Sequence, residues 1–405
     1  MVLSLFSTLN LYLLYRLARA AGANETESAW ALLFMAASNT SFYYARHLVP
    51  YECALSAVLL AAEVGLRRLT PVRALICGLL AGIAYGIYNG YWYAVPVIWL
   101  VHLLACWREP QWWRLTTSCA AGATLAVVAP IAWGAGLGGA SYWEAAGVFA
   151  RSATLGLFAE GWSLPWEYLF HSEEIFGLTA AGCIVLAFFS VLRAGAPLPR
   201  WVLGTLIALV AAYGLLVLFS CGLERFVVYA RTVKPLVPLL ALLAGWALAR
   251  LLERWPRLQP VALAGLIAAA AVNFWPHFPR LFPRDIEIAV MRHWGNPKRT
   301  LSVAGSLYVG LELPVKRPDL ALVNAQLLYP VRSYVGVPAG DTLLRFDHPV
   351  SYRPFQYECQ TPRERSLLRS HDISIRLIRL AAPGTLPDNP PPSLLYRAED
   401  RPTGR

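Results

Sequence analysis

The sequence predicts an all-α polytopic membrane protein with about ten transmembrane helices and a small C-terminal α/β domain outside the membrane. Hydrophobic residues make up 57% of the 405 residues and charged residues only 15%, whereas soluble domains carry roughly 25% charged residues. The mean hydropathy is +0.47, which excludes a disordered chain. Twelve of the 24 acidic residues follow position 275, and no aspartate precedes Asp285. We therefore expect a membrane bundle at 1–275, a polar domain at 276–381 and a tail at 382–405.

Ten segments are apolar enough to be candidate spans, because only a helix of ~20 mostly apolar residues satisfies its own backbone in hydrocarbon. Polar residues interrupt the second span at 39–41 and the third at Glu52 and Glu63, as expected for helices that line a polar cavity. The predicted spans are 1–17, 28–44, 51–66, 72–88, 91–107, 115–135, 174–192, 201–220, 233–249 and 258–275.

The arginine and lysine residues between the spans predict the orientation, because cytoplasmic loops are rich in them. One set of loops carries twelve such residues and the alternate set only five, so the richer set should be cytoplasmic and both chain ends should lie outside. The first helix would then run from outside to inside with no translocation signal before it. We expect from this that a further crossing precedes Met1.

The remaining segments are predicted to lie outside the membrane, on the face opposite the cytoplasm. Loop 136–173 alternates aromatic residues with glutamates, which is typical of interfacial helices. In the polar domain a helix is expected at Asp285–Trp294, and strands at Thr300–Ala304, Leu320–Val323 and Ile373–Leu380. The proline-rich segment from Ala382 is expected to be disordered.

Several function classes lack their sequence signatures. The net charge of +11 comes without a nucleic-acid-binding motif, so arginine-rich membrane loops explain it and we expect no nucleic acid partner. The seven cysteines are scattered without metal-ligand spacing, so no metal site is predicted. No phosphate-binding loop, zinc-protease motif or serine nucleophile motif is present, and no cofactor is expected.

Charged residues at the predicted outer face are the candidate site. Arg46 and Glu52 flank a proline break between two spans, where charges are costly and usually face a cavity; the alternative is an arginine that reaches the headgroups. Arg225, Arg231 and Lys234 form a second cluster that could hold a phosphate; the alternative is an anchor for anionic lipids.

Aromatic residues at Tyr85–Tyr93 form a tight outer corner, since Asn89-Gly90 favours a turn. Their faces suit sugar rings, although an ordinary interfacial aromatic belt would give the same composition.

The order of these features over residues 1–275 resembles the C-type membrane glycosyltransferases, the relatives of protein mannosyltransferases and of the aminoarabinose lipid A transferase. The resemblance rests on the segments Leu13–Leu17, Tyr43–Arg46 with Pro50, Gly78–Ala84, Leu164–Leu169, and Arg225 followed by Pro235 and Pro238.

The resemblance implies transfer of a sugar, with inversion, from a polyprenyl-phosphate carrier to a lipid, glycan or protein acceptor at the outer face of a bacterial inner membrane. It implies that cations hold the leaving phosphate and that an acidic residue in the first outer loop acts as base. That loop has no matching position here, so Glu52 is the remaining candidate base and this chain is expected to be inactive alone. Candidate sugar or acceptor contacts are Tyr44, Tyr88, Asn89, Trp166 and Glu167. A flippase for a lipid-linked glycan and a noncatalytic membrane scaffold remain as alternatives.

Overall fold

The computed structural model divides the chain into two compact units, 1–275 and 276–405. The second unit is described only through its strands. The described residues are 2–45, 50–67, 69–136, 162, 164–168, 170, 173, 175–195, 197–223, 225–226, 228, 230–274, 296–302, 316–325, 340–348 and 373–380.

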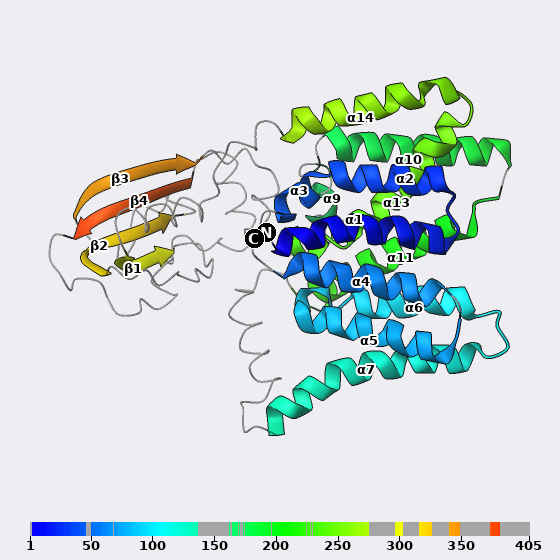
Figure 1. The fold of residues 1–405 in the computed structure, drawn as a ribbon, viewed down its shortest axis with the longest axis horizontal. Coiled ribbons are helices and arrows are strands. Elements are labelled where there is room, and N and C mark those ends of the chain that lie inside the picture. Colours follow the sequence, from blue (N-terminus) through cyan, green and yellow to red (C-terminus); the bar gives the residue numbers. More distant parts are fainter. Residues whose placement is uncertain are drawn as a thin grey trace. The chain divides into compact units, whose positions relative to one another are not determined.

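The first unit is a bundle of antiparallel and parallel helices, with a helix at each of the ten positions predicted from the sequence (Figure 1). The long helices are α1 (Val2–Ala21), α2 (Glu25–Ala37), α4 (Tyr51–Leu66), α5 (Pro71–Ile87), α6 (Ala94–Cys106), α7 (Trp112–Gly136), α10 (Ile175–Ala194), α11 (Arg200–Val217), α13 (Leu236–Leu252) and α14 (Gln259–Phe274). The short ones are α3 (Asn39–Ala45), η1 (Asn89–Tyr91), α9 (Leu164–Glu167), η3 (Leu218–Gly222), α12 (Ala230–Val233) and η4 (Pro256–Leu258).

Three of these helical stretches are long and apolar enough to cross a membrane: Trp112–Gly134, Phe176–Arg193 and Arg200–Gly222. Three further apolar helices are shorter, at Pro71–Ile87, Leu236–Leu252 and Pro256–Val272. Their outward side chains are apolar and exposed, as lipid-facing surfaces require; examples are Val210 and Val261, which are 67% and 65% exposed. The structure is therefore mostly helical and has the character of a membrane protein.

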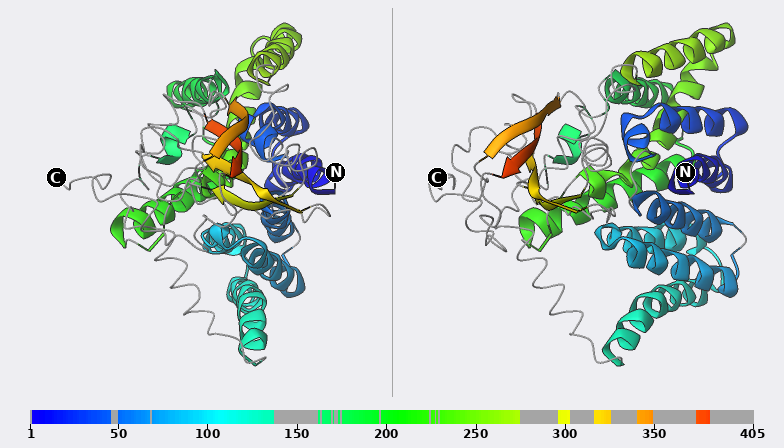
Figure 2. Two further views of the ribbon diagram at one scale, coloured as in Figure 1. Left: turned by 90° about the vertical axis from the view of Figure 1, so that its left-hand side faces the viewer. Right: turned by 60° about the vertical axis from the view of Figure 1, so that its left-hand side comes forward.

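Helices α7 and α14 lie at opposite edges of the bundle, and α1, α2, α4 and α13 lie between them (Figures 1 and 2). Glycines allow the closest approaches. A Cβ added at Gly78 of α5 would lie 1.8 Å from the Cys119 carbonyl oxygen of α7, and one at Gly245 of α13 would lie 2.4 Å from the Ala31 nitrogen of α2. Small residues at such contacts let backbones pack directly, as in membrane helix pairs.

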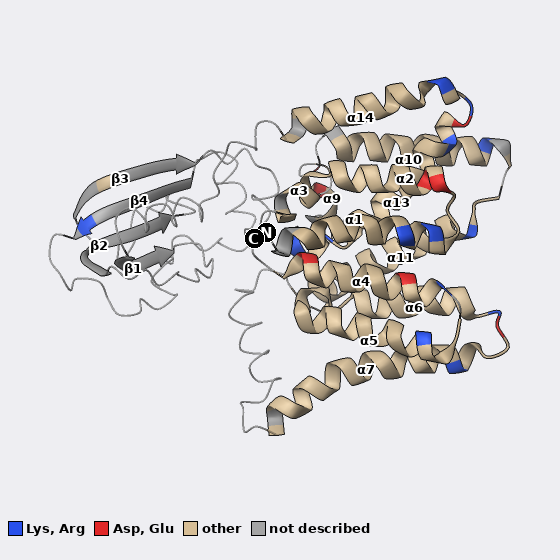
Figure 3. Cartoon of the chain, in the orientation of Figure 1, with Lys and Arg blue, Asp and Glu red and all other residues tan. Residues whose placement is uncertain are grey.

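Arginines gather at the end of the bundle where α1, α10 and α13 finish, which we call the Arg16 end (Figure 3). There the buried carboxylate of Glu63 accepts hydrogen bonds from Arg16 at 2.8 and 3.1 Å and pairs with Arg67 at 2.6 Å. Both arginines are partly exposed, so they keep their charge in water while they neutralise Glu63. The opposite end, where α4 and α13 begin, is called the Glu52 end.

The second unit contains a four-stranded sheet of order β1-β2-β4-β3, formed by β1 (Asn296–Ser302), β2 (Lys316–Ala325), β3 (Gly340–His348) and β4 (Ile373–Leu380). β1 and β2 are parallel, whereas β4 is antiparallel to both β2 and β3. The sequence indicated strands overlapping β1, β2 and β4 but missed β3. The helix expected at 285–294 and the tail 382–405 lie outside the described residues.

The predicted second span, 28–44, is not one helix. α2 ends at Ala37, Ser38 is extended with φ −70° and ψ 132°, and α3 starts at Asn39. The break falls at the polar run that the sequence marked as an interruption. Most of loop 136–173 lies outside the described residues, apart from α9 and a few residues on either side of it.

Candidate functional site

A buried ion pair lies at the Glu52 end of the bundle. The Lys234 ammonium, just before α13, contacts the Glu52 carboxylate in the first turn of α4. The two side chains are only 2% and 3% exposed. Removing two charges from water costs several kcal/mol per ion, so a pair like this is weak as a source of stability. Ionisable groups inside a membrane bundle instead indicate a functional site.

Polar groups of α1 and α4 complete the pair. The Asn10 amide donates to the second carboxyl oxygen of Glu52 at 2.5 Å and to its backbone carbonyl at 3.1 Å. The Ser56 hydroxyl donates to the Asn10 side-chain oxygen at 2.6 Å, which fixes the orientation of the amide. Asn10 is fully buried and Ser56 is 6% exposed. Glu52 is thus held by groups from three helical segments.

Aromatic rings form one wall beside the ion pair. The Lys234 nitrogen lies 4.5 Å from the centroid of the Tyr44 ring, close enough for a cation–π contact. From Tyr44 an unbroken series of edge-to-face contacts continues through Tyr51, Tyr88 and Tyr91, with centroid separations of 5.6, 4.6 and 5.0 Å. The corner expected at 85–93 therefore lies next to the charged pair rather than forming an isolated interfacial belt.

The corner is also tied to the segment that carries Lys234. The Tyr93 hydroxyl donates to the Thr232 carbonyl at 2.5 Å, and both residues are buried. Tyr88 is half-buried and Asn89 is exposed. A sugar contact at this corner would therefore involve the exposed Asn89 amide and one edge of the Tyr88 ring.

The three cations expected to act together differ in exposure. Arg225 is exposed, Arg231 is half-buried and Lys234 is buried against Glu52. Lys234 is therefore paired with Glu52, and the grouping of Arg225, Arg231 and Lys234 around a phosphate stays a prediction. Arg46 lies outside the described residues, so its expected proximity to Glu52 stays a prediction.

A second buried carboxyl group, Glu173, holds the start of α3. It accepts hydrogen bonds from the Ser38 hydroxyl at 3.0 Å and from the backbone N–H groups of Asn39 at 2.7 Å and Thr40 at 3.1 Å. The Thr40 hydroxyl also contacts it and lies 2.9 Å from the Tyr168 hydroxyl. Burial raises the pKa of Glu173 above its ordinary value, and the hydrogen bonds oppose this shift.

The remaining predicted contacts belong to α9. Trp166 is 47% exposed and packs against Phe170 and Tyr213, with centroids 6.5 and 5.6 Å apart. Glu167 is half-buried. Trp166 thus keeps about half of its surface exposed, and it precedes Tyr168 and Glu173 by a few residues.

Sequence reasoning missed Asn10 and Glu173 as members of the site. Asn10 is the only amide side chain in the first apolar segment, which is itself the signal of a buried hydrogen-bonding partner. Glu173 was counted among the acidic residues of an interfacial loop, and nothing local distinguished it from its neighbours. Among the described residues, no group of three or more metal-ligating side chains comes together.

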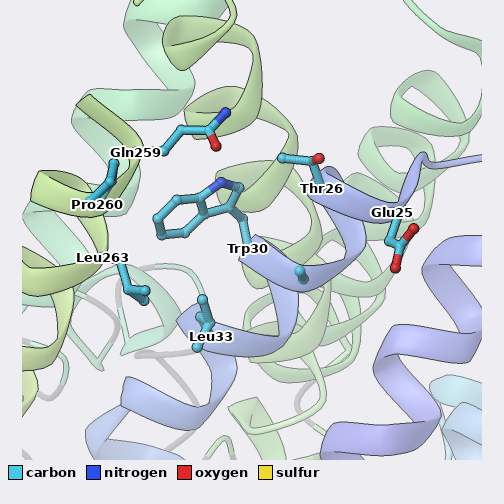
Figure 4. A pocket seen from close by; sticks show the side chains of 8 residues that line it. Glu25, Thr26, Trp30, Leu33, Gln259, Pro260 and Leu263 are labelled. Atoms are coloured by element: carbon cyan, nitrogen blue, oxygen red, sulfur yellow. The ribbon is translucent and has the colours of Figure 1, made fainter. Parts of the chain in front are cut away.

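A separate groove of about 480 Å³ lies near the Arg16 end, between the first turns of α2 and α14 (Figure 4). Trp30 and Leu33 of α2 face Leu263 and Pro260 of α14, and polar atoms of Thr26 and Gln259 stand at its rim. Glu25 also lines it, and no ion pair within the described part of the chain involves its lining residues.

Comparison with known proteins gives no match: no protein-family model, no curated protein and no solved structure is similar to this chain.

Proposed function

We propose that the protein is a membrane glycosyltransferase that moves a sugar from a polyprenyl-phosphate carrier to a cell-envelope acceptor at the outer face of a bacterial inner membrane. The Glu52 end of the bundle is its active site, and the bundle crosses the membrane about ten times. The sheet-containing unit then lies outside the cytoplasm. The proposal builds on the order of motifs in the sequence.

The observation that supports it most is the buried Glu52–Lys234 pair beside the tyrosine wall. Sugar transfer from a lipid phosphate needs a carboxylate to take the acceptor proton, cations to stabilise the leaving phosphate, and apolar faces against which the sugar stacks. This end of the bundle holds one group of each type: Glu52, Lys234 and Tyr88.

In the proposed reaction, Glu52 accepts the proton of the acceptor hydroxyl while the hydroxyl oxygen bonds to the anomeric carbon. The bond between that carbon and the phosphate oxygen breaks, and its electron pair leaves with the polyprenyl phosphate. Lys234 and the more exposed Arg225 and Arg231 stabilise the phosphate as it gains charge. Attack from the face opposite the phosphate inverts the configuration of the sugar.

The test is to purify the chain in lipid nanodiscs, supply a radiolabelled polyprenyl-phosphate sugar with envelope lipid as acceptor, and measure product. With Glu52 as the base the chain should be active, in contrast to the expectation from the sequence that it is inactive alone. We expect transfer that Glu52→Gln reduces by about 10²–10⁴-fold, the usual effect of losing a general base. Arg250→Gln, at the opposite end of the bundle, is the matched control and should transfer at the wild-type rate.

Two other classes would give different results in the same preparation. A flippase for a lipid-linked glycan would move the labelled donor between the leaflets of a proteoliposome without forming product, and Glu52→Gln would slow that movement. A noncatalytic scaffold would do neither. Either outcome, with a folded protein and a suitable donor, contradicts the assignment as a transferase.

A further inference from the structure

We propose that Glu173 is a positioning residue of this site: it anchors α3 so that the Tyr44 ring covers Lys234, and release of the anchor opens the Glu52–Lys234 pair to a ligand. That the ligand is a sugar donor or acceptor rests on the proposed function. The anchoring itself rests only on contacts within the described residues.

The anchor joins two segments far apart in the chain. Glu173 lies 133 to 135 residues after its partners Ser38, Asn39 and Thr40, and its carboxyl group is buried with them. The backbone donors of Asn39 and Thr40 are the ones that every helix start leaves without an intrahelical acceptor. The Tyr168 hydroxyl adds a contact to Thr40 at 2.9 Å, so Tyr168 and Glu173 together hold the start of α3 at more than one point.

The start of α3 does not need a distant carboxyl group in order to form. Ser38 already accepts a hydrogen bond from the Ser41 N–H at 3.1 Å, which is an ordinary cap supplied by the chain itself. A buried carboxyl group adds a desolvation cost that such a cap avoids. The additional effect of Glu173 is to fix where α3 lies relative to the segment that follows α9.

The position of α3 determines what covers Lys234. Thr40 and Tyr44 are four residues apart, so they share one face of the helix about one turn apart. A displacement of Thr40 by its contacts therefore moves Tyr44 with it. Tyr44 is fully buried with its ring 4.5 Å from the Lys234 nitrogen, and Lys234 is 1% exposed.

In this geometry, binding of a ligand at Trp166 can change the exposure of Lys234. Exposed Trp166 lies two residues before Tyr168, so a sugar or lipid that binds at Trp166 bears on the same segment that holds α3. Movement of this segment would withdraw Glu173 and Tyr168 from Thr40 and shift the Tyr44 ring away from Lys234. The ammonium could then exchange its contact with Glu52 for an anionic ligand.

Lysine labelling tests the anchor without any substrate. The chain contains only three lysines, Lys234, Lys298 and Lys316, so mass spectrometry can follow acetylation of each one by an N-hydroxysuccinimide ester. Lys234 should react slowly in the wild type. In Glu173→Ala it should react at least about tenfold faster, since one hydrogen bond to a charged group contributes that order in an opening equilibrium. Lys298 and Lys316 serve as internal references and should keep their rates.

Four further variants make the result specific. Tyr44→Ala removes the cover directly and should also accelerate labelling of Lys234. Glu253→Ala removes an exposed carboxylate at the other end of the bundle and should change nothing. If Glu173→Ala fails to fold, Glu173→Gln and Tyr168→Phe weaken the anchor with little change in shape and should each give a smaller acceleration.

An unchanged Lys234 rate in the folded Glu173 and Tyr168 variants would overturn the proposal, as would an equal acceleration in Glu253→Ala. The result does not depend on sugar transfer. If the anchor exists but the protein is not a transferase, labelling still accelerates while no product forms. If the protein is a transferase without this anchor, Glu173→Gln transfers sugar normally and Lys234 stays protected.

Discussion

Breaking the Glu52–Lys234 pair should cost far more than removing both partners together. Lys234→Met leaves the Glu52 carboxylate 3% exposed and supported by Asn10, while Glu52→Gln leaves the ammonium facing the Tyr44 ring. Loss of one partner of a buried pair costs about 3–5 kcal/mol, because the other charge stays buried without compensation. Each kcal/mol lowers Tm by about 2–4 °C in domains of 150–250 residues, so each single variant should unfold about 6–20 °C below the wild type.

The double variant Glu52→Gln/Lys234→Met carries no buried charge at this position. Replacing both members of a buried pair is often neutral, so its free energy of unfolding should lie within about 1 kcal/mol of the wild-type value. The coupling energy of the double-mutant cycle should then be close to the sum of the two single losses. The exposed pair Arg250–Glu253 is the control; its side chains are 44% and 54% exposed, and its coupling should stay below about 1 kcal/mol.

Unfolding can be followed with a dye that fluoresces on reaction with thiols, because Cys77 and Cys119 are buried inside the bundle and become reactive only when it opens. Nanodiscs keep the lipid environment constant across the series. Additive losses, with the double variant less stable than either single one, would refute the reasoning, since they would mean that the two charges do not compensate each other.

Three other predictions concern packing, pH and orientation. Gly78→Ala and Gly122→Ala should each destabilise the bundle by about 1–3 kcal/mol through overpacking, because the new Cβ would lie 1.8 Å from the Cys119 oxygen and 2.2 Å from the Leu75 oxygen; Gly134→Ala, with no atom within 4 Å, is the matched control for Tm. Because burial raises the pKa of Glu173 above 4.5, its contribution to stability is full below pH 4.5 and is lost as pH rises through the raised pKa. As the pH is raised from 4 to 8, the Tm of Glu173→Gln should therefore rise relative to the wild-type Tm. A difference between the two Tm values that does not change with pH would contradict this. A reporter that is active only outside the cytoplasm should be active when fused after Leu380 and silent after Arg200, and the reverse activities would overturn the orientation.

The sequence predicted the helices well because each depends on local information. A run of apolar residues, ended by arginine, proline or glycine, indicates a helix, and helical residues occupy each of the ten predicted segments of 1–275. The second segment is broken at Ser38, and three of the described helical stretches are long and apolar enough to cross a membrane. The break near Ser38 could also be predicted from the sequence, since Asn39, Thr40 and Ser41 interrupt an apolar segment. What remained hidden was the partner of that break, because four long described helices, α4 to α7, separate Glu173 from it in the chain.

Strand β3 was not predicted from the sequence, for a different reason. The segment Gly340–His348 has a period-2 pattern with one exception, Leu343. Its charged positions are Asp341, Arg345 and Asp347, and they alternate with Thr342, Leu344 and Phe346. The charges made the segment look like a loop. β3 is an edge strand of the sheet, and charged residues are common at edges because they discourage pairing with other chains. The composition that hid the strand is thus typical of its position.

The ion pair shows why the candidate site could be predicted only in part. The hydropathy of the segments and the charge asymmetry of the loops indicate at which end of a helix a residue lies. Glu52 and Lys234 could therefore be assigned to the same end of the bundle. They say nothing about which helices are neighbours across that end. The lateral order comes from packing, as where Gly245 lets α13 meet Ala31 of α2 while α1 and α4 exchange hydrogen bonds through Asn10 and Ser56. Only that order brings Lys234 to Glu52, a contact that proximity in the sequence could not reveal because 182 residues separate the two.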